Sequence, residues 1–204
     1  VAVSPDGGVV YVADASNHRI RAIVIATGAV TTLAGSGSVG SADGMGTAAS
    51  FNYPYGIAVS PDGRVLYVTD GSNHLIREIV IATGAVTTLA GSGSGGFADG
   101  TGTAARFYYP DGLVVSPDSL VVYVADRENQ RIRAIVVATG AVTTLAGSGS
   151  RGYADGPGTA ARFDRPYGVA VSPDGLVLYE VDTESHYIRK IVIATGAVTT
   201  LAGS

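Results

Sequence analysis

The sequence predicts an all-β protein built from four copies of one small antiparallel sheet. The string Thr-Leu-Ala-Gly-Ser recurs at 32–36, 88–92, 144–148 and 200–204, and Ser-Pro-Asp begins at residues 4, 60, 116 and 172. Both spacings are 56 residues, and so strict a period indicates one supersecondary unit copied in tandem. The 204 residues make three periods of 56 with 36 residues left, so the fourth copy is shorter by 20 residues.

The second copy shows why each unit is expected to form strands. Its apolar, β-branched and aromatic residues fall in four short runs, as strands require. Between the first two runs, Pro61 presets φ and Gly63 accepts a positive φ, which favours a tight turn at 60–63. The third run is apolar almost throughout, which is typical of a strand covered on both faces. The four expected strands are 57–59, 65–68, 74–82 and 85–89.

A single sheet of this kind cannot bury both of its faces, whereas neighbouring copies can do so by stacking face to face. Such stacking is the principle of a β-propeller, so we expect four propeller blades of four antiparallel strands each, as part of a larger ring or assembly. Residues 1–204 then form a single propeller region. Its blades are predicted at 1–36, 57–92, 113–148 and 169–204, and its connectors at 37–56, 93–112 and 149–168.

Each connector is expected to dock on the blades through a helical turn and an aromatic anchor. In the second connector, Thr103 is predicted to cap the helical turn and Pro110 to stop it. The anchors are the phenylalanines that recur once per connector, Phe51, Phe107 and Phe163.

Composition excludes several classes of function. A net charge of −4 argues against a nucleic-acid-binding surface, which needs a basic patch. No apolar run approaches the roughly 18–20 residues of a membrane span. The absence of cysteine excludes disulfides, thiolate metal sites and cysteine nucleophiles.

The turn before the third strand carries a family signature. Asn73-His74-Leu75 resembles the NHL-repeat family, which is named for this tripeptide, and the equivalent turns read Asn17-His18-Arg19, Asn129-Gln130-Arg131 and Ser185-His186-Tyr187. The resemblance covers the whole chain and implies a β-propeller, often of six blades, that serves mostly in protein or RNA recognition. Some relatives are lyases or other enzymes. The long connector resembles a subtype found in large multidomain and cell-surface proteins, which favours an extracellular or surface location.

Charged residues that recur in every copy are predicted to be structural, because a catalytic site is usually asymmetric. We expect each aspartate to accept backbone N–H groups in its turn, and each arginine to pair with it or with a neighbouring blade. These residues are Asp14, Asp70, Asp126, Asp182, Arg21, Arg77, Arg133 and Arg189.

No cofactor or metal is predicted. His18, His74 and His186 occupy equivalent turns on different blades and cannot all reach one zinc ion at about 2.0–2.1 Å. The connectors supply one aspartate each, too few for the 6–8 oxygens of a calcium site, which leaves a weak ion site shared with backbone carbonyls as the alternative. Those aspartates are Asp43, Asp99 and Asp155.

Positions where the copies differ are the better candidates for a partner site. Glu180 stands where the other copies have Val12, Val68 and Val124, and a buried unpaired carboxylate is costly. We therefore expect Glu180 to be exposed, paired or at an interface. The other candidates, in outer turns and connectors, are Arg127, Glu128, Arg151, Asp164, Arg165, Glu184 and Tyr187.

These observations predict a noncatalytic module for protein interaction or self-association, without nucleic acid, membrane insertion or a small-molecule substrate. The alternative is a lyase or lactonase with a metal in the central channel. That enzyme needs polar ligands on several inner strands, yet 1–3, 57–59, 113–115 and 169–171 contain no His, Asp, Glu or Asn. For ring closure we rank three arrangements: an excerpt of a larger propeller, several copies completing a ring or fibre, and four blades closing alone.

Overall fold

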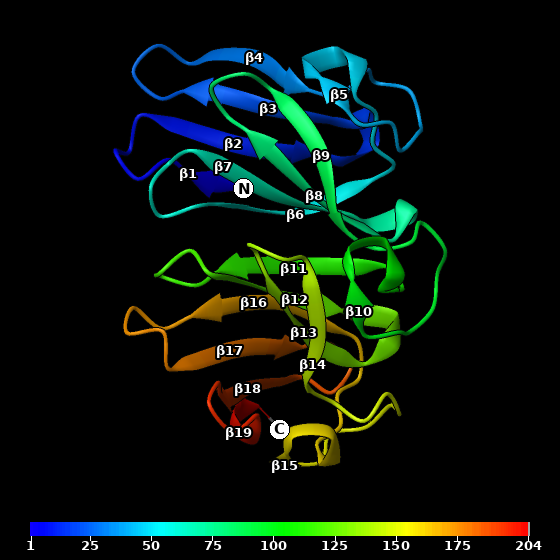
Figure 1. The fold of residues 1–204 in the computed structure, drawn as a ribbon. Helices are drawn as coiled ribbons and strands as arrows, with labels where there is room; N and C mark the ends of the chain where they lie inside the picture. The colour runs from blue at the N-terminus through cyan, green and yellow to red at the C-terminus, as the bar shows by residue number, and fades with distance from the viewer. Residues whose placement is uncertain (204) are drawn as a thin grey trace.

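The computed structural model describes residues 1–203, which form four antiparallel sheets stacked in chain order (Figure 1). Each sheet contains the four predicted strands, so the predicted propeller blades are confirmed. Ser204, the last residue of the predicted fourth blade, lies outside the described residues. The strands of the four sheets are β1 (Ala2–Val3), β2 (Val9–Asp14), β3 (Arg19–Val24) and β4 (Ala29–Ala34); β6 (Pro54–Val59), β7 (Val65–Asp70), β8 (Leu75–Val80) and β9 (Ala85–Ala90); β11 (Pro110–Val115), β12 (Val121–Asp126), β13 (Arg131–Val136) and β14 (Ala141–Ala146); and β16 (Pro166–Val171), β17 (Val177–Asp182), β18 (Tyr187–Val192) and β19 (Ala197–Gly203).

The connectors add a fifth strand that the sequence does not reveal. β5 (Gly44–Met45), β10 (Gly100–Thr101) and β15 (Gly156–Pro157) pair with β9, β14 and β19, the outermost strands of the blades that follow. These two-residue strands consist of Gly, Met, Thr and Pro, and they are made by backbone pairing rather than by an apolar pattern.

The inner strands and the connector helices also differ from the prediction. The inner strands begin at Pro54, Pro110 and Pro166, three residues early, because a bulge lets each proline pair with the aspartate ending the next strand. The predicted helical turn is a 3-10 helix at Gly102–Ala104. Its predicted Thr103 cap is wrong, because Thr101 is the capping residue and makes no side-chain bond.

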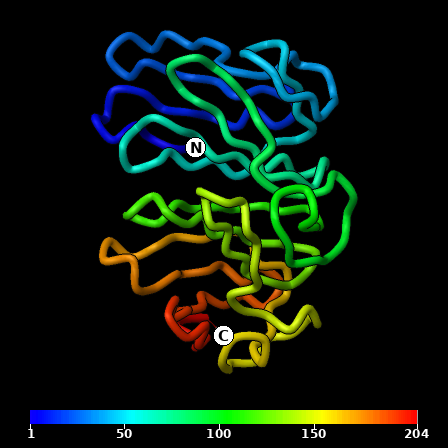
Figure 2. The backbone as a smooth tube through the Cα atoms, viewed as in Figure 1, coloured from blue at the N-terminus to red at the C-terminus, as the bar shows by residue number. Residues whose placement is uncertain are grey.

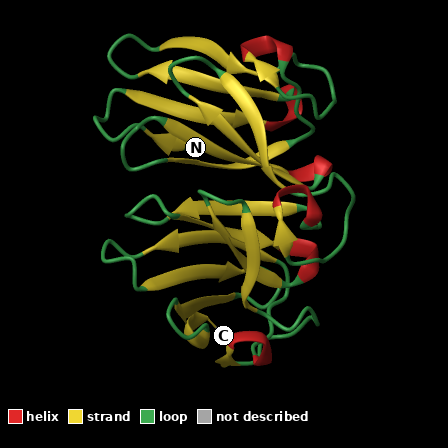
Figure 3. Ribbon diagram, in the orientation of Figure 1, coloured by secondary structure: helices red, strands yellow, loops and turns green. Residues whose placement is uncertain are grey.

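The short helices gather at one end of the sheets, which we call the connector face (Figure 3). In three copies a 3-10 helix also fills the polar turn between the second and third strands, with a left-handed residue after it. Ser-Pro-Asp turns lie at the opposite end of the strands. The short helices are η1 (Ala15–Asn17), η2 (Gly46–Ala48), η3 (Gly71–Asn73), η4 (Gly102–Ala104), η5 (Arg127–Asn129) and η6 (Gly158–Ala160).

The sheets pack through two different faces. The face turned toward the next sheet, which we call the forward face, carries Tyr11 and Ile20 in the first sheet. The opposite or reverse face of the second sheet carries Leu66 and Val68, and the two faces form one core. The same pairing recurs at the next two boundaries. Figure 2 shows the resulting succession of sheets along the backbone.

The predicted phenylalanine anchors are confirmed as core residues. Phe51, Phe107 and Phe163 are completely buried. Each ring lies beside the guanidinium of the recurring arginine, with distances of 5.2, 5.1 and 5.4 Å from Cζ to the ring centroid. The connector is therefore held by both apolar packing and a cation–π contact.

The buried arginine binds the connector as well as its own blade. Arg77 donates to Asp70 at 2.8 Å within the blade. It also donates to Asp43 at 2.7 Å and to the carbonyls of Ala42 and Ser50, all in the preceding connector. Arg133 and Arg189 likewise bridge their blade aspartate to Asp99 and Asp155. The recurring charges thus fix the path of each connector.

The family tripeptide connects each blade to both of its connectors. Asn73 donates to the carbonyl of Gly40 in the connector before the blade, at 2.7 Å. His74 accepts through Nδ1 the N–H of Tyr109 in the connector after the blade, at 3.1 Å. Tyr109 has φ 50°, which is unusual for a residue other than glycine, so this bond holds a strained backbone.

We predict that Arg77→Met costs about 3–5 kcal/mol of unfolding free energy, because it leaves the buried Asp70 carboxylate without its partner. Arg21→Met is the matched control, since within residues 1–203 Arg21 forms no ion pair, and its cost is expected below about 1 kcal/mol. Urea denaturation measures both. Equal losses in the two variants would contradict this role.

We predict that His74→Gln preserves stability at pH 7.5, because Gln130 supplies the equivalent acceptor to Arg165 N at 2.7 Å in the third blade. Burial lowers the pKa of His74 below 6.5, so its stabilising contribution is complete above pH 6.5 and is lost as pH falls through the folded-state pKa.

His74→Gln should therefore lose less stability than wild type between pH 7.5 and pH 5. His74→Ala should be about 1 kcal/mol less stable than wild type at pH 7.5, and this difference should shrink at pH 5, where wild type has itself lost the contribution of the histidine. Thermal unfolding midpoints across this range test the prediction, and an unchanged acid dependence in the glutamine variant would refute it.

Candidate functional site

Six of the predicted candidate residues come together on the connector face, at the boundary between the third and fourth blades. They form one group of ion pairs, which we call the ion-pair cluster: Arg127, Glu128, Arg151, Asp164, Arg165 and Glu184. η5 supplies the first two, and the connector and the turn after β17 supply the rest. Residues far apart in the repeat thus form one site.

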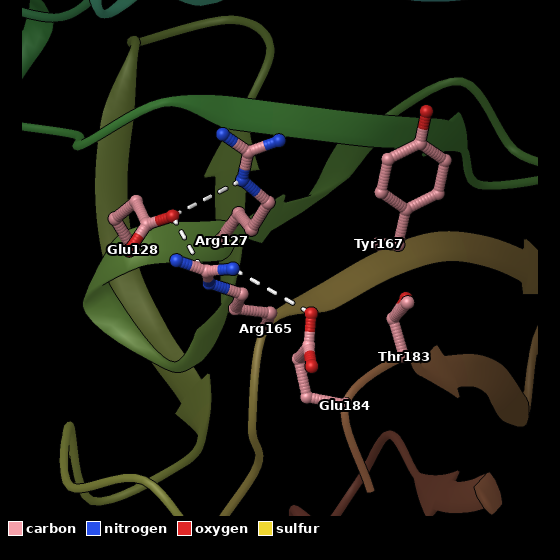
Figure 4. A pocket seen from close by; sticks show the side chains of 6 residues that line it. All are labelled: Arg127, Glu128, Arg165, Tyr167, Thr183 and Glu184. Atoms are coloured by element: carbon pink, nitrogen blue, oxygen red, sulfur yellow. Dashed lines mark ion pairs between the residues drawn. The ribbon is translucent and has the colours of Figure 1, made fainter. Parts of the chain in front are cut away.

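Glu128 lies at the centre of this cluster. Its carboxylate is within 3.5 Å of Arg127 Nε, 3.5 Å of Arg151 Nη2 and 3.4 Å of Arg165 Nε. Arg165 also reaches Glu184 at 3.5 Å. Figure 4 shows Arg127, Glu128, Arg165 and Glu184 around a hollow of about 250 Å³. Tyr167 and Thr183 complete its lining.

The contacts within the cluster are looser than those of the structural pairs. The five ion pairs between its members span 3.4–3.7 Å, whereas Arg77, Arg133 and Arg189 approach their aspartates at 2.7–3.1 Å. Arg127 Nε and Arg165 Nε are buried without a hydrogen-bond acceptor among the described residues, as are the Nε atoms of Arg77, Arg133 and Arg189. The side chains of Arg151 and Arg165 are 53% and 40% exposed, so these two guanidinium groups are accessible to an acceptor brought by a partner.

Sequence reasoning missed one member of the site, Asp111. It follows Pro110 where the other two copies have Tyr55 and Tyr167, so the same comparison of repeats could have found it. Its carboxylate accepts from Arg127 at 3.1 Å, yet burial raises the pKa of Asp111 to about 6. Near pH 6 protonation of Asp111 weakens its hold on Arg127.

Aromatic side chains surround the cluster. Tyr167 is exposed beside it, and Tyr153 packs at 5.7 Å from the ring of the predicted Tyr187. A second hollow of about 400 Å³ lies between Arg151, Asp164, Glu184 and this tyrosine pair. Exposed Tyr53, Tyr55 and Tyr108 continue along the connector face of the earlier blades. Tyrosine and arginine are the residues enriched at the centres of protein interfaces.

Glu180 does not belong to this surface, and its predicted partner-binding role is not supported. It is completely buried, and neither carboxyl oxygen has a hydrogen-bond partner within residues 1–203. Because side chains alternate along a strand, Glu180 shares the reverse face with Leu178, inside the core between the third and fourth blades. Burial, reinforced by Asp182, raises its pKa well above 4.5, although Arg189 opposes the shift.

No group of three or more His, Cys, Asp or Glu side chains within residues 1–203 is arranged to hold a metal ion. In the same part of the chain, no helix has the length and apolar character to cross a membrane.

The family model of the NHL repeat matches residues 1–23, 51–79 and 107–135. Each match begins near an inner strand and ends in a third strand that carries the recurring arginine. The chain is built of NHL repeats. In the second copy, Asn73 and His74 of the tripeptide that gives the repeat its name make the two hydrogen bonds to the connectors described above.

Two relatives match nearly all of this NHL-repeat chain. It is 32% identical over 206 residues to Protein SUPPRESSOR OF QUENCHING 1, chloroplastic, of Arabidopsis thaliana, covering 95% of this chain and 19% of that protein. It is 30% identical over 213 residues to NHL repeat-containing protein 2 of Bos taurus, covering 93% of this chain and 29% of that protein. The chain thus spans less than a third of either relative.

Among solved structures, an auxiliary nutrient binding protein from Bacteroides thetaiotaomicron matches with a TM-score of 0.75 and 24% identity. The match covers 97% of this chain and 46% of that one, and it supports the propeller fold.

We predict that Glu180→Val, which restores the residue of the other three copies, stabilises the protein by about 1–4 kcal/mol at pH 8. The folded-state pKa of Glu180 is raised. Its contribution to the unfolding free energy is therefore complete below pH 4.5 and is lost as pH rises through the folded-state pKa. Glu180→Gln keeps the side-chain shape and should flatten the same pH dependence. Denaturant unfolding at pH 5 and pH 8 tests both variants; a gain at pH 5 as large as at pH 8 would contradict the prediction.

Proposed function

We propose that this NHL-repeat chain is a noncatalytic protein-interaction module that binds its partner on the connector face. The observation that carries the proposal is the ion-pair cluster, a group of charges at one blade boundary only. At the equivalent positions of the second copy stand Gly71, Ser72 and Tyr109 in place of Arg127, Glu128 and Arg165. The scaffold does not need these charges, since the second blade folds without them.

The chemistry of the site suits the binding of a protein partner. Three arginines in loose ion pairs can exchange Glu128 or Glu184 for carboxylates or backbone carbonyls of a partner. The neighbouring tyrosines provide apolar area with hydroxyl groups at the rim. The two hollows between them accept single side chains rather than an extended substrate. NHL repeats commonly mediate protein interactions, which agrees with this assignment.

We predict that ligands selected from a random peptide display library against the chain bind the connector face. Arg165→Tyr and Arg127→Gly introduce residues that the second copy carries at the same positions, so the fold is retained while the cluster is removed. Each variant should weaken selected ligands at least about tenfold, as expected for an interface hot spot. Fluorescence anisotropy measures the affinities.

Leu176→Ser, in an exposed turn at the opposite end of the sheets, is the matched control and should leave affinity unchanged. Ligands that bind the cluster variants as tightly as wild type would refute the proposed site. Stoichiometric bound metal, together with a hydrolytic activity lost on chelation, would instead favour the enzyme.

A further inference from the structure

A hollow of about 380 Å³ opens between the third and fourth blades, at the end of the sheets opposite the connector face. We call this end the turn face, because the Ser-Pro-Asp turns form it. The turns of both blades contribute, with Asp118 from the third blade and Asp174 from the fourth. A similar hollow of about 260 Å³ lies between the first and second blades, with Asp6 and Asp62 in the equivalent places. Both hollows lie between blades that pack on each other inside the stack.

The aspartates of the larger hollow are each held by their own turn through one carboxylate oxygen. Asp118 Oδ1 accepts the Ser116 hydroxyl at 2.6 Å and the backbone N–H of Leu120 at 3.0 Å, and Asp174 Oδ1 is bound in the same way. The serine hydroxyl, followed by the backbone N–H, lowers the pKa of each carboxyl group, so both are ionised at neutral pH. Neither carboxylate is paired with a cation of residues 1–203, so Oδ2 of each is left for a ligand.

A buried tyrosine faces the same hollow with an unused hydroxyl group. Tyr123 lines the hollow and is only 5% exposed. Its hydroxyl makes no hydrogen bond to the described part of the chain. Burial and the charge of Asp118 raise its pKa, which places the hydroxyl on the side of the turn. The oxygen can accept a hydrogen bond from a cationic donor. Tyr11 stands beside Asp6 in the same way in the first hollow.

The remaining walls of the larger hollow are apolar, and they consist of Pro117, Val121, Leu176 and Ile193. An aliphatic stem with a cation at its tip matches such walls beside two carboxylates. Lysine and arginine side chains have this form, and they bury their methylene groups along apolar surface while the charged head stays among polar groups. A calcium ion needs 6–8 oxygen ligands, more than the two carboxylates and one hydroxyl provide. The chemistry of the hollow therefore selects a basic side chain.

One position in the turn decides how open each hollow is. A Cβ added to Gly175 would lie 3.4 Å from Pro117 of the preceding blade. One added to Gly63 would lie 3.3 Å from Pro5. The third copy has Ser119 at this position, with φ 64° against 72° for Gly175, so the same turn carries a side chain there. Glycine thus keeps space beside the proline, and the repeat itself tolerates a serine that fills it.

We propose that the hollows of the turn face bind lysine or arginine side chains of a protein partner, one side chain in each hollow. The aspartates of adjacent turns and the tyrosine hydroxyl hold the cationic head, and the apolar walls hold the stem. The net charge of −4 on the chain favours the approach of a basic partner. This second interface lies at the opposite end of the sheets from the ion-pair cluster and does not depend on it.

Nuclear magnetic resonance titration of the isotope-labelled chain with acetyl-Gly-Lys-Gly-amide tests the proposal. The lysine peptide, and its arginine counterpart, should shift the amide signals of Asp118, Tyr123 and Leu176 saturably at millimolar concentration. The norleucine peptide keeps the stem without the charge and should bind about threefold more weakly, as expected for the loss of one exposed ion pair. The glutamate peptide should not shift these signals.

Two variants separate the charge of the hollow from its shape. Asp118→Asn retains an oxygen that accepts from Ser116, and it should weaken the lysine peptide about threefold. Gly175→Ser introduces the residue of the third copy and should narrow the hollow, with a similar loss. Asp14→Asn makes the same change of charge at the connector end of β2, and this matched control should leave the affinity unchanged.

The proposed site is overturned if the lysine peptide shifts signals elsewhere or none at all, or if it binds no better than the norleucine peptide. An equal loss of affinity in Asp118→Asn and Asp14→Asn would also overturn it, because it would show attraction to the net charge alone. Peptide ligands selected for the connector face should bind Asp118→Asn and Gly175→Ser as they bind wild type, so the two proposals fail separately.

Discussion

The buried arginine of the second, third and fourth repeats makes the interaction on which the rest of the structure depends. The two Nη groups of Arg77 donate to Asp70 in the blade and to Asp43 and two carbonyls in the connector. Such a pair is costly to bury: burial raises the pKa of Asp126 to about 6 even beside Arg133. The buried Asp–Arg pair therefore acts as a constraint on the fold, because neither charge can be buried without the other. The chain meets this constraint only when the connector wraps back over the blade.

The constraint explains why the connector face can carry a site. Arg77, Arg133 and Arg189 fix the connectors. The connector residues that donate an N–H to the preceding blade then keep one backbone conformation while their side chains vary. Tyr53, Tyr109 and Arg165 all have positive φ, near 50–59°, and all donate an N–H to the preceding blade. An aromatic side chain can therefore be replaced by arginine there without changing the fold, and the ion-pair cluster is built from such replacements.

The repeat period and the strand patterns predict the four blades, the buried phenylalanines and the Asp–Arg pairs, because each depends on side chains that recur. Backbone pairing is harder to predict, so the fifth strands at Gly44–Met45 and its equivalents are missed. The second ligand of each arginine is missed for another reason. Asp43 and Arg77 are 34 residues apart and meet only through the fold. Glu180 is misplaced because energetic cost argues for exposure, whereas its strand position places it in the core.

Repetition has opposite consequences at the two kinds of surface. On the connector face, the copies have diverged, and the divergence at Asp111, Arg127 and Arg165 makes one boundary chemically different from the others. On the sheet faces, the copies have stayed alike, because each forward face must fit a reverse face.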